Sequence, residues 1–303
     1  MLGADTVRIG HDSKELSRRP SAGGKLNSLE LMICGATSGA FAKSAIAPMD
    51  RIKILFQTDP RKQFSLSNAT RLARQLYTSS GVWSFWRGHT ATLVRVIPYS
   101  ATNFLVFARA HEWLDRSLGE VLHPAGVKFT AGAISGSAAV CVTYPLETLR
   151  ARLAVDLESR YSRGYFEAVR SIAKADGLSS LYSGLRPTLV GIVPYAGTSF
   201  AVYETLKSED ANYGHRLLIG ALAGFLAQAA TYPLDVIRRR MQVKPFENTS
   251  VMSTFTKIVK GEGAVRGLYK GLSMNVFKGP IAVAISLSTN DYLKQVFLHR
   301  HSA

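Results

Sequence analysis

Three six-residue stretches of this chain share one pattern: PMDRIK at residues 48–53, PLETLR at 145–150 and PLDVIR at 233–238. Each stretch reads proline, any residue, an acid, any two residues and a base. Each proline is preceded, thirteen and nine residues earlier, by two glycines: Gly35 and Gly39, Gly132 and Gly136, Gly220 and Gly224. Because three copies keep one register, the chain is predicted to consist of three repeats.

A second element follows each stretch and ends with an aromatic residue two positions before a glycine. The aromatic residues, used below as reference points, are Trp86, Tyr182 and Tyr269. Apolar stretches with helical character follow at about 88–112, 184–207 and 271–295. Since a helix needs about 20 residues to span a bilayer, the sequence predicts an all-α membrane protein with six transmembrane helices in three pairs.

The composition favours an anionic partner that is not nucleic acid. Lys and Arg number 37 against 21 Asp and Glu, for a net charge of +16, while 47% of residues are hydrophobic and only 19% charged. A basic protein this apolar fits a membrane protein that handles anions better than a soluble nucleic-acid binder. Because a lone charge in hydrocarbon costs about 2.5–3.5 kcal/mol, the polar residues of the helices are expected to face a water-filled central cavity.

The sequence offers no sign of an enzyme. It contains no phosphate-binding glycine loop, no Gly-x-Ser-x-Gly elbow and no His, Cys and Asp cluster with metal-ligand spacing. The two cysteines, Cys34 and Cys141, lie in separate apolar stretches and are expected to be buried thiols. We therefore expect no catalytic residue, no cofactor and no metal.

The repeated motifs resemble the signature of the mitochondrial carrier family (solute carrier family 25) over residues 29–295. The resemblance implies two transmembrane helices and a short matrix helix per repeat, with alternating access to one central site. It also implies a monomer in the mitochondrial inner membrane, with the bilayer and cardiolipin as lipid partners. Repeats are assigned to 29–119, 120–213 and 214–299, after a loose tail at 1–28. The chain departs from the family at Ser80, where an acid is usual, and at Ser183, where a base is usual.

Within the family, the run from Arg238 to Gln242 and the segments at 271–275 and 278–283 look most like the coenzyme A carriers. This likeness predicts exchange of coenzyme A for adenine nucleotides such as ADP and adenosine 3′,5′-diphosphate. An ADP/ATP-type exchanger is the first alternative, although Gln242 and Val243 interrupt the Arg-Arg-Arg-Met-Met-Met run of that branch. A proton-leak carrier and a basic binding protein without transport activity are more remote alternatives.

The resemblance also implies two gates. Because proline kinks a helix, Pro48, Pro145 and Pro233 are the predicted hinges. The matrix gate is predicted to pair Asp50 with Arg150, Glu147 with Arg238, and Asp235 with Lys53, braced by Gln57 and Gln242. The cytoplasmic gate is predicted at Glu204, Lys207, Asp291 and Lys294. The first repeat has Ala108 and His111 at the equivalent positions, so this gate is expected to open easily.

The predicted substrate site lies nine residues after each reference aromatic, at Arg95, Gly191 and Lys278. Two bases and one glycine at one depth form an asymmetric site, and unpaired bases there favour an anionic ligand. Lys43 and Arg239 are expected to add positive charge. Gly191 and Ile192 offer a flat apolar slot, and Tyr195 offers a ring for stacking. In the nucleotide carriers of the family, a glycine followed by an aliphatic residue at this place is associated with adenine binding.

Overall fold

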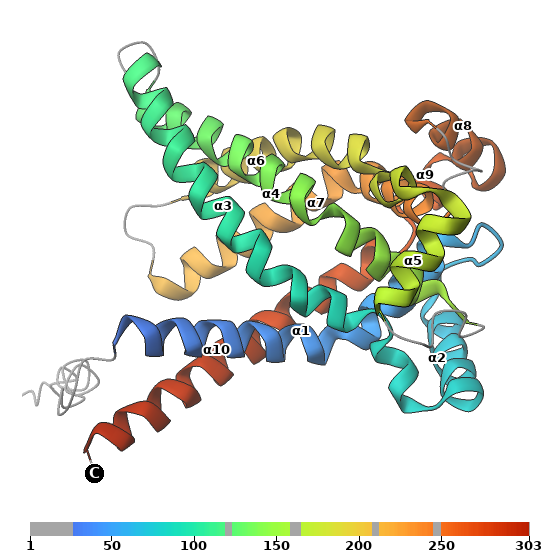
Figure 1. Cartoon of the computed structure of the whole chain (residues 1–303), viewed down its shortest axis with the longest axis horizontal. Coiled ribbons are helices and arrows are strands. Elements are labelled where there is room, and N and C mark those ends of the chain that lie inside the picture. The colour runs from blue at the N-terminus through green and yellow to red at the C-terminus, as the bar shows by residue number, and fades with distance from the viewer. Residues whose placement is uncertain (1–26, 119–122, 158–164, 208–211, 245–249, 303) are drawn as a thin grey trace, which may run out of the picture. The chain divides into compact units, whose positions relative to one another are not determined.

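The computed structural model describes residues 27–118, 123–157, 165–207, 212–244 and 250–302, and these residues form helices and no strands (Figure 1). The predicted tail at 1–28 lies almost wholly outside the described residues. The chain divides into two compact units, one of residues 42–284 and one made of the segments before Ala42 and after Ala284. All contacts discussed below as part of the site lie within the unit of residues 42–284.

The element order repeats three times: a long helix, a short helix, a tight turn and a second long helix. The long helices are α1 (Ser28–Thr58), α3 (His89–Leu118), α4 (Pro124–Val155), α6 (Leu185–Leu206), α7 (Tyr213–Val243) and α10 (Leu272–Ser302). The short helices are α2 (Leu66–Ser80), α5 (Tyr165–Asp176) and α8 (Val251–Glu262). The turns are η1 (Val82–Trp86), η2 (Leu178–Tyr182) and the five-residue α9 (Ala264–Leu268). Helix α3 packs along α4, and α6 packs along α7 (Figure 1).

The predicted second helices of each pair are present, with ends that differ from the expected ones. Helices α3 and α10 continue to Leu118 and Ser302, beyond the expected ends at 112 and 295, whereas α6 ends at Leu206. The two cysteines are free thiols, of which Cys34 is buried, as expected, and Cys141 is partly exposed.

Three described segments are long and apolar enough to cross a membrane: Val82–Leu118, Pro124–Val155 and Gly214–Val243. Several large apolar residues of α3 are exposed, among them Ile97 at 76% and Phe104 at 75%. Extensive exposed apolar surface indicates contact with another apolar medium. These segments therefore have the surface of a lipid-facing protein.

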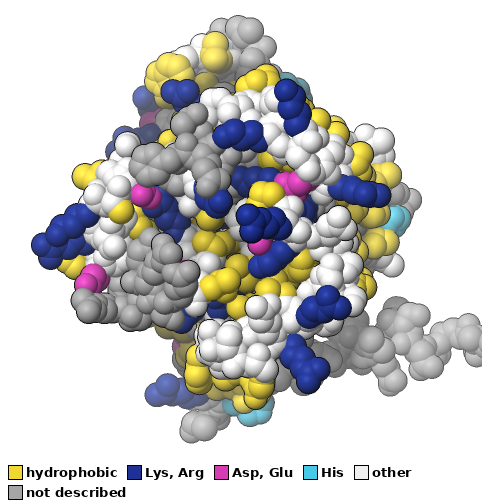
Figure 2. Space-filling model, turned by 90° about the vertical axis from the view of Figure 1, so that its right-hand side faces the viewer, with side chains coloured by type: hydrophobic (Ala, Val, Ile, Leu, Met, Phe, Trp, Pro, Cys, Tyr) yellow, Lys and Arg dark blue, Asp and Glu magenta, His cyan; other side chains and the backbone are white. Residues whose placement is uncertain are grey.

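Each short helix buries one apolar face against the end of the long helix that precedes it. The packed side chains include Leu72 and Leu76 of α2 on Leu55, Ile172 of α5 on Leu149, and Ile258 of α8 on Ile237. Full burial of one such aliphatic side chain contributes about 1.5–3 kcal/mol, so this packing holds each short helix against the motif-bearing turns. Figure 2 shows the end of the molecule that carries α2, α5 and α8, where Lys and Arg side chains outnumber Asp and Glu.

A glycine with positive φ begins the second long helix of each repeat, and at Gly184 the space is also restricted. Its φ is 87°, and an added Cβ would lie 2.9 Å from the Arg238 carbonyl oxygen and from the Tyr144 hydroxyl. A side chain is disfavoured there both by the left-handed backbone conformation and by this close approach. Gly184 therefore allows α6 to start directly against the motif helix of the next repeat.

We expect Gly184→Ala to lower the midpoint of thermal unfolding of the purified protein by about 3 °C or more, because left-handed strain alone costs about 1–3 kcal/mol. Gly197→Ala in the same helix is the control, since no heavy atom lies within 4 Å of its added Cβ. Alanine favours helix over glycine by about 1 kcal/mol, so this control should keep or raise the midpoint. Equal midpoints for the two variants would contradict the packing role of Gly184.

Candidate functional site

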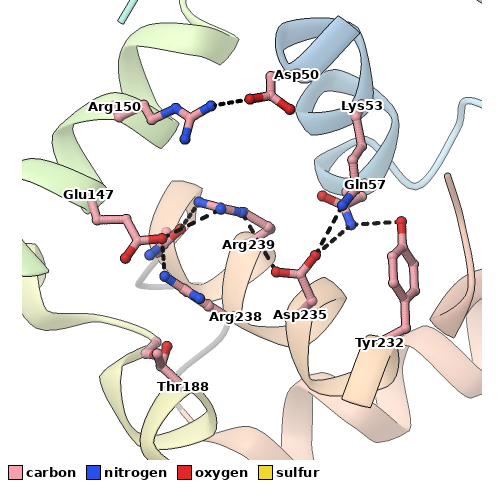
Figure 3. Close-up of polar contacts among 12 residues, drawn as sticks. Asp50, Lys53, Gln57, Glu147, Arg150, Thr188, Tyr232, Asp235, Arg238 and Arg239 are labelled. Carbon is pink, nitrogen blue, oxygen red and sulfur yellow. Dashed lines mark hydrogen bonds and ion pairs between the residues drawn. The ribbon is translucent and has the colours of Figure 1, made fainter. Parts of the chain in front are cut away.

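The motif residues of α1, α4 and α7 meet in one cluster of ion pairs (Figure 3). Pro48, Pro145 and Pro233 each lie inside one of these helices, two residues before the motif acid and five before the motif base. The Asp50 Oδ2 atom lies 2.7 Å from Arg150 Nη2, the Asp235 Oδ2 atom lies 3.3 Å from Lys53 Nζ, and Glu147 contacts Arg238. The structure thus brings together all three acid and base pairs named from the sequence, and each pair joins two different repeats.

Gln57 braces one of these pairs through a tyrosine. Its Nε2 atom donates to Asp235 Oδ2 at 3.2 Å and to the Tyr232 hydroxyl at 3.1 Å (Figure 3). The Tyr232 hydroxyl in turn donates to the Lys270 carbonyl oxygen at 2.9 Å. Because these groups are buried, each hydrogen bond also avoids the cost of an unsatisfied polar atom. The brace therefore ties the Lys53 and Asp235 pair to the turn that follows α9.

Gln242 occupies the equivalent place between the third and second repeats. Its Nε2 atom donates to the Tyr144 hydroxyl at 3.1 Å, and its Oε1 atom accepts from Arg239 at 3.0 Å. The first motif has Ala47 where the other two have these tyrosines, and Ala154 stands where Gln57 and Gln242 stand. The pair of Asp50 and Arg150 accordingly has no such brace.

The tyrosines Tyr144 and Tyr232 were not identified as functional residues from the sequence. Each directly precedes the motif proline, and each ring stacks on the reference aromatic of its own repeat, with centroid separations of 6.3 and 6.2 Å. Lys53 and Arg238 lie over these rings at 5.0 and 5.8 Å from the centroids. The repetition of an aromatic before proline was the available signal.

Arg95 and Lys278 are not unpaired, which corrects the expectation from the sequence. Arg95 Nη1 lies 3.0 Å from Glu147 Oε2, and Lys278 Nζ lies 2.6 Å from Asp50 Oδ1. Their position in the register faces the motif acid of the following repeat, and a largely buried carboxylate is costly unless cations surround it. Each of these two acids is therefore shared between a motif base and a base from a second long helix.

Arg239 is also part of the cluster. Its Nη2 atom lies 3.4 Å from Glu147 Oε1, and its Nε atom lies 4.0 Å from Asp235 Oδ1. Lys43 is exposed and lies within electrostatic range of Arg95 and Arg150. Three carboxylates in total contact six basic side chains, which are Lys53, Arg95, Arg150, Arg238, Arg239 and Lys278. The cluster thus carries a surplus of positive charge.

A cavity of about 450 Å³ opens among α3, α4, α6 and α7, next to this cluster. Gly191, Ile192 and Tyr195 line it, as do the motif residues Asp235 and Arg238. Gly191 stands where the other repeats carry Arg95 and Lys278, and an added Cβ would lie 3.6 Å from Leu234 Cδ1. The cavity therefore lies beside the position where the threefold pattern lacks a base.

Three buried arginines that sequence reasoning missed join the repeats through the main chain. Arg51, Arg152 and Arg240 donate through Nε to the carbonyl oxygens of Ala154, Gln242 and Gln57 at 2.9, 2.9 and 3.0 Å. Each acceptor lies nine residues after the motif proline of another repeat. These bonds hold the ends of the three motif helices together irrespective of the ion pairs.

The contacts of the same arginines show the effect of having Ser80 where the family usually has an acid. Arg152 also pairs with Asp176 at 2.5 Å, and Arg240 pairs with Glu262; both acids directly precede a turn glycine. Ser80 precedes the glycine of the first repeat, and Arg51 donates to the main-chain oxygen of Ser84, as Arg152 does to that of Ser180. The first repeat thus keeps the main-chain hydrogen bond but has a serine where the other two repeats have the paired acid.

The predicted cytoplasmic gate residues do not form a comparable cluster within the unit of residues 42–284. Lys207 Nζ lies 3.7 Å from Glu204 Oε1, which is a contact within the end of one helix. Asp291 and Lys294 belong to the other unit. His111 of the first repeat packs against the Phe107 ring, with the centroids 5.7 Å apart. The gating role of these residues stays a prediction.

Three repeated helix pairs, a proline inside each motif helix and interlocked ion pairs are features of a membrane carrier, and the chain belongs to the mitochondrial carrier family. The family model described as mitochondrial carrier protein matches residues 24–118, 123–209 and 209–301. The resemblance drawn from the motifs is thereby confirmed. The chain is accordingly a multi-pass protein of the mitochondrial inner membrane and belongs among transporters rather than enzymes.

Similar proteins cover nearly the whole chain. The mitochondrial coenzyme A transporter of Mus musculus is 47% identical over 90% of this chain and 89% of its own length. The human protein of the same name is 45% identical over 90% of each chain. The mitochondrial carrier protein CoAc2 of Zea mays is 35% identical over 87% of this chain and 85% of its own length.

Proposed function

We propose that this chain exchanges coenzyme A for adenine nucleotides, such as ADP and adenosine 3′,5′-diphosphate, across the mitochondrial inner membrane. The observation that carries the proposal is the surplus of bases over carboxylates beside a cavity opened by Gly191. Phosphate groups require such bases, and the cavity offers room for a flat ring. The similarity to proteins named coenzyme A transporters supports this choice of substrate.

The transport path in this proposal runs between six membrane-spanning helices, α1, α3, α4, α6, α7 and α10. Besides the three segments that meet the length and hydropathy limits, the remaining long helices carry charged residues such as Lys53 and Lys278 that lower their hydropathy. These charges contact other charges of the cluster. Family resemblance implies that one chain encloses the transport path, so we propose a monomeric carrier.

The shared carboxylates suggest how substrate opens the matrix gate. Phosphate oxygens that bind Arg95 and Lys278 compete with Glu147 and Asp50 for these bases. A ligand shifts a conformational equilibrium only by its difference in affinity for the two states. In this proposal the substrate binds best once Arg95 and Lys278 have left the carboxylates, and binding therefore weakens the gate that closes the path.

Uptake of radiolabelled coenzyme A into liposomes containing the purified protein tests the proposal. Liposomes preloaded with ADP or adenosine 3′,5′-diphosphate are expected to take up at least tenfold more coenzyme A than empty liposomes, because exchange requires a counter-substrate. Protein-free liposomes with the same preload give the background. Exchange of ATP for ADP without any uptake of coenzyme A would instead identify an ADP/ATP-type exchanger.

A further inference from the structure

Two amide side chains of the cavity have hydrogen-bonding capacity that the described structure does not use. Asn103 of α3 and Gln228 of α7 line the cavity, and neither forms a hydrogen bond with another described residue. The hydroxyls of Thr188 and Thr231 line the same cavity but donate to carbonyl oxygens of their own helices at 2.8 and 2.9 Å. Unlike these threonine hydroxyls, the amides are therefore available to a ligand.

Both amides also break the threefold pattern. Gln228 lies five residues before its motif proline, where the other repeats have Lys43 and Val140. Asn103 lies eight residues after Arg95, and the two equivalent positions hold serine. A helix-packing role common to the three repeats would favour similar residues at these positions. Amides at only one position of each set instead suit a ligand whose own shape is asymmetric.

The chemistry of an amide matches the edge of adenine. Asn and Gln donate and accept at once, and they form paired hydrogen bonds with the N6 amino group and a ring nitrogen of adenine. The rings of Tyr99 and Tyr195 lie in the same cavity, and aromatic rings stack on bases without distinguishing them. The Lys and Arg side chains of the ion-pair cluster bind phosphate and cannot distinguish one purine from another either. The amides, each with a donor and an acceptor on separate atoms, are therefore suited to selecting the base.

We propose that Asn103 and Gln228 read the hydrogen-bonding edge of adenine and so make the carrier select adenine over hypoxanthine. This inference rests on the proposed function, because it requires a substrate with an adenine ring. Hypoxanthine is the sharpest comparison, since an oxygen replaces the N6 amino group and N1 carries a proton. An amide oxygen that accepts from the N6 amino group of adenine would face the oxygen of hypoxanthine, which is also an acceptor.

The test compares binding of ADP and IDP to the purified protein, measured by the ligand concentration that gives half of the maximal rise in thermal unfolding midpoint. The wild type is expected to need about tenfold less ADP than IDP, which corresponds to about 1.4 kcal/mol. In Asn103→Leu and Gln228→Leu, which keep the approximate size of the side chain, the ratio should fall toward one with the IDP value unchanged. Gln75→Leu on the exposed face of α2 is the matched control and should keep the wild-type ratio.

Equal weakening of ADP and IDP in the variants would overturn the proposal, because it indicates a merely structural role. An unchanged ratio in both variants, or a wild type that does not distinguish the two ligands, would overturn it as well. The measurement does not involve coenzyme A uptake. A protein that selects ADP through these amides but transports no coenzyme A would therefore contradict only the proposed function.

Discussion

Replacing Arg95 and Lys278 together by alanine is expected to reduce coenzyme A uptake into liposomes by at least about a hundredfold. Hydrogen bonds to charged groups contribute about 1.5–3 kcal/mol each, and two lost contacts to phosphate correspond to a factor of roughly 10² to 10⁴. The fold should survive, because Glu147 keeps Arg238 and Asp50 keeps Arg150 when the second bases are removed. Initial rates of uptake and the thermal unfolding midpoint measure both effects.

Arg116→Ala is the control for this double variant. Arg116 is 77% exposed and pairs with Glu112 one turn away in the same helix. An exposed pair of this kind contributes about 0.3–0.5 kcal/mol, so uptake should stay within twofold of the wild type. Uptake by the double variant within threefold of the wild type would show that these bases serve only to neutralise Glu147 and Asp50.

The sequence was sufficient for the repeats and for the partners within the motif pairs. The motifs stand at a fixed distance from the glycines before them, and such regularity is retained only if the three units have the same structure. The partners within the motif pairs were implied by the resemblance to the carrier family, and Asp50 contacts Arg150 as that resemblance implies. Because the repeats are equivalent, Gln57 and Gln242 make equivalent hydrogen bonds to the hydroxyls of Tyr232 and Tyr144.

The contacts of Arg95 and Lys278 with motif carboxylates could not be predicted in the same way. The register places Arg95 and Lys278 at one depth, but it does not show that their long side chains reach the motif acids. A flexible basic side chain adopts whichever contact the surrounding charges favour. The role of Arg51 was hidden for a related reason, since its acceptors are main-chain oxygens that no sequence pattern records.

The variant Gly191→Lys is expected to lose coenzyme A uptake while gaining thermal stability. Gly191 stands where Arg95 and Lys278 stand in the other repeats, and those bases contact Glu147 and Asp50. A lysine at position 191 would give Asp235 a cation from α6, in addition to Lys53 at 3.3 Å and Arg239 at 4.0 Å. One charged hydrogen bond of about 1.5–3 kcal/mol would raise the unfolding midpoint by about 3 °C or more, and the side chain would fill the cavity.

The two effects separate a locked gate from a damaged fold. Gly191→Ala is the matched control, because its Cβ would lie 3.6 Å from Leu234 Cδ1, an ordinary contact distance. We expect this variant to retain uptake within about threefold, since a methyl group fills little of the 450 Å³ cavity. Uptake and unfolding midpoint of both variants, measured on the same preparations, provide the comparison.

A lysine variant that still transports would contradict the view that the missing base makes room for the substrate. A lysine variant that is inactive and less stable would contradict the equivalence of the three positions, since Asp235 would then not accept a cation from α6. The expected combination, higher stability without uptake, follows only if the break in the threefold pattern at Gly191 keeps one third of the gate weaker. On this view the carrier gives up one ion pair at Asp235 to gain a place for its substrate.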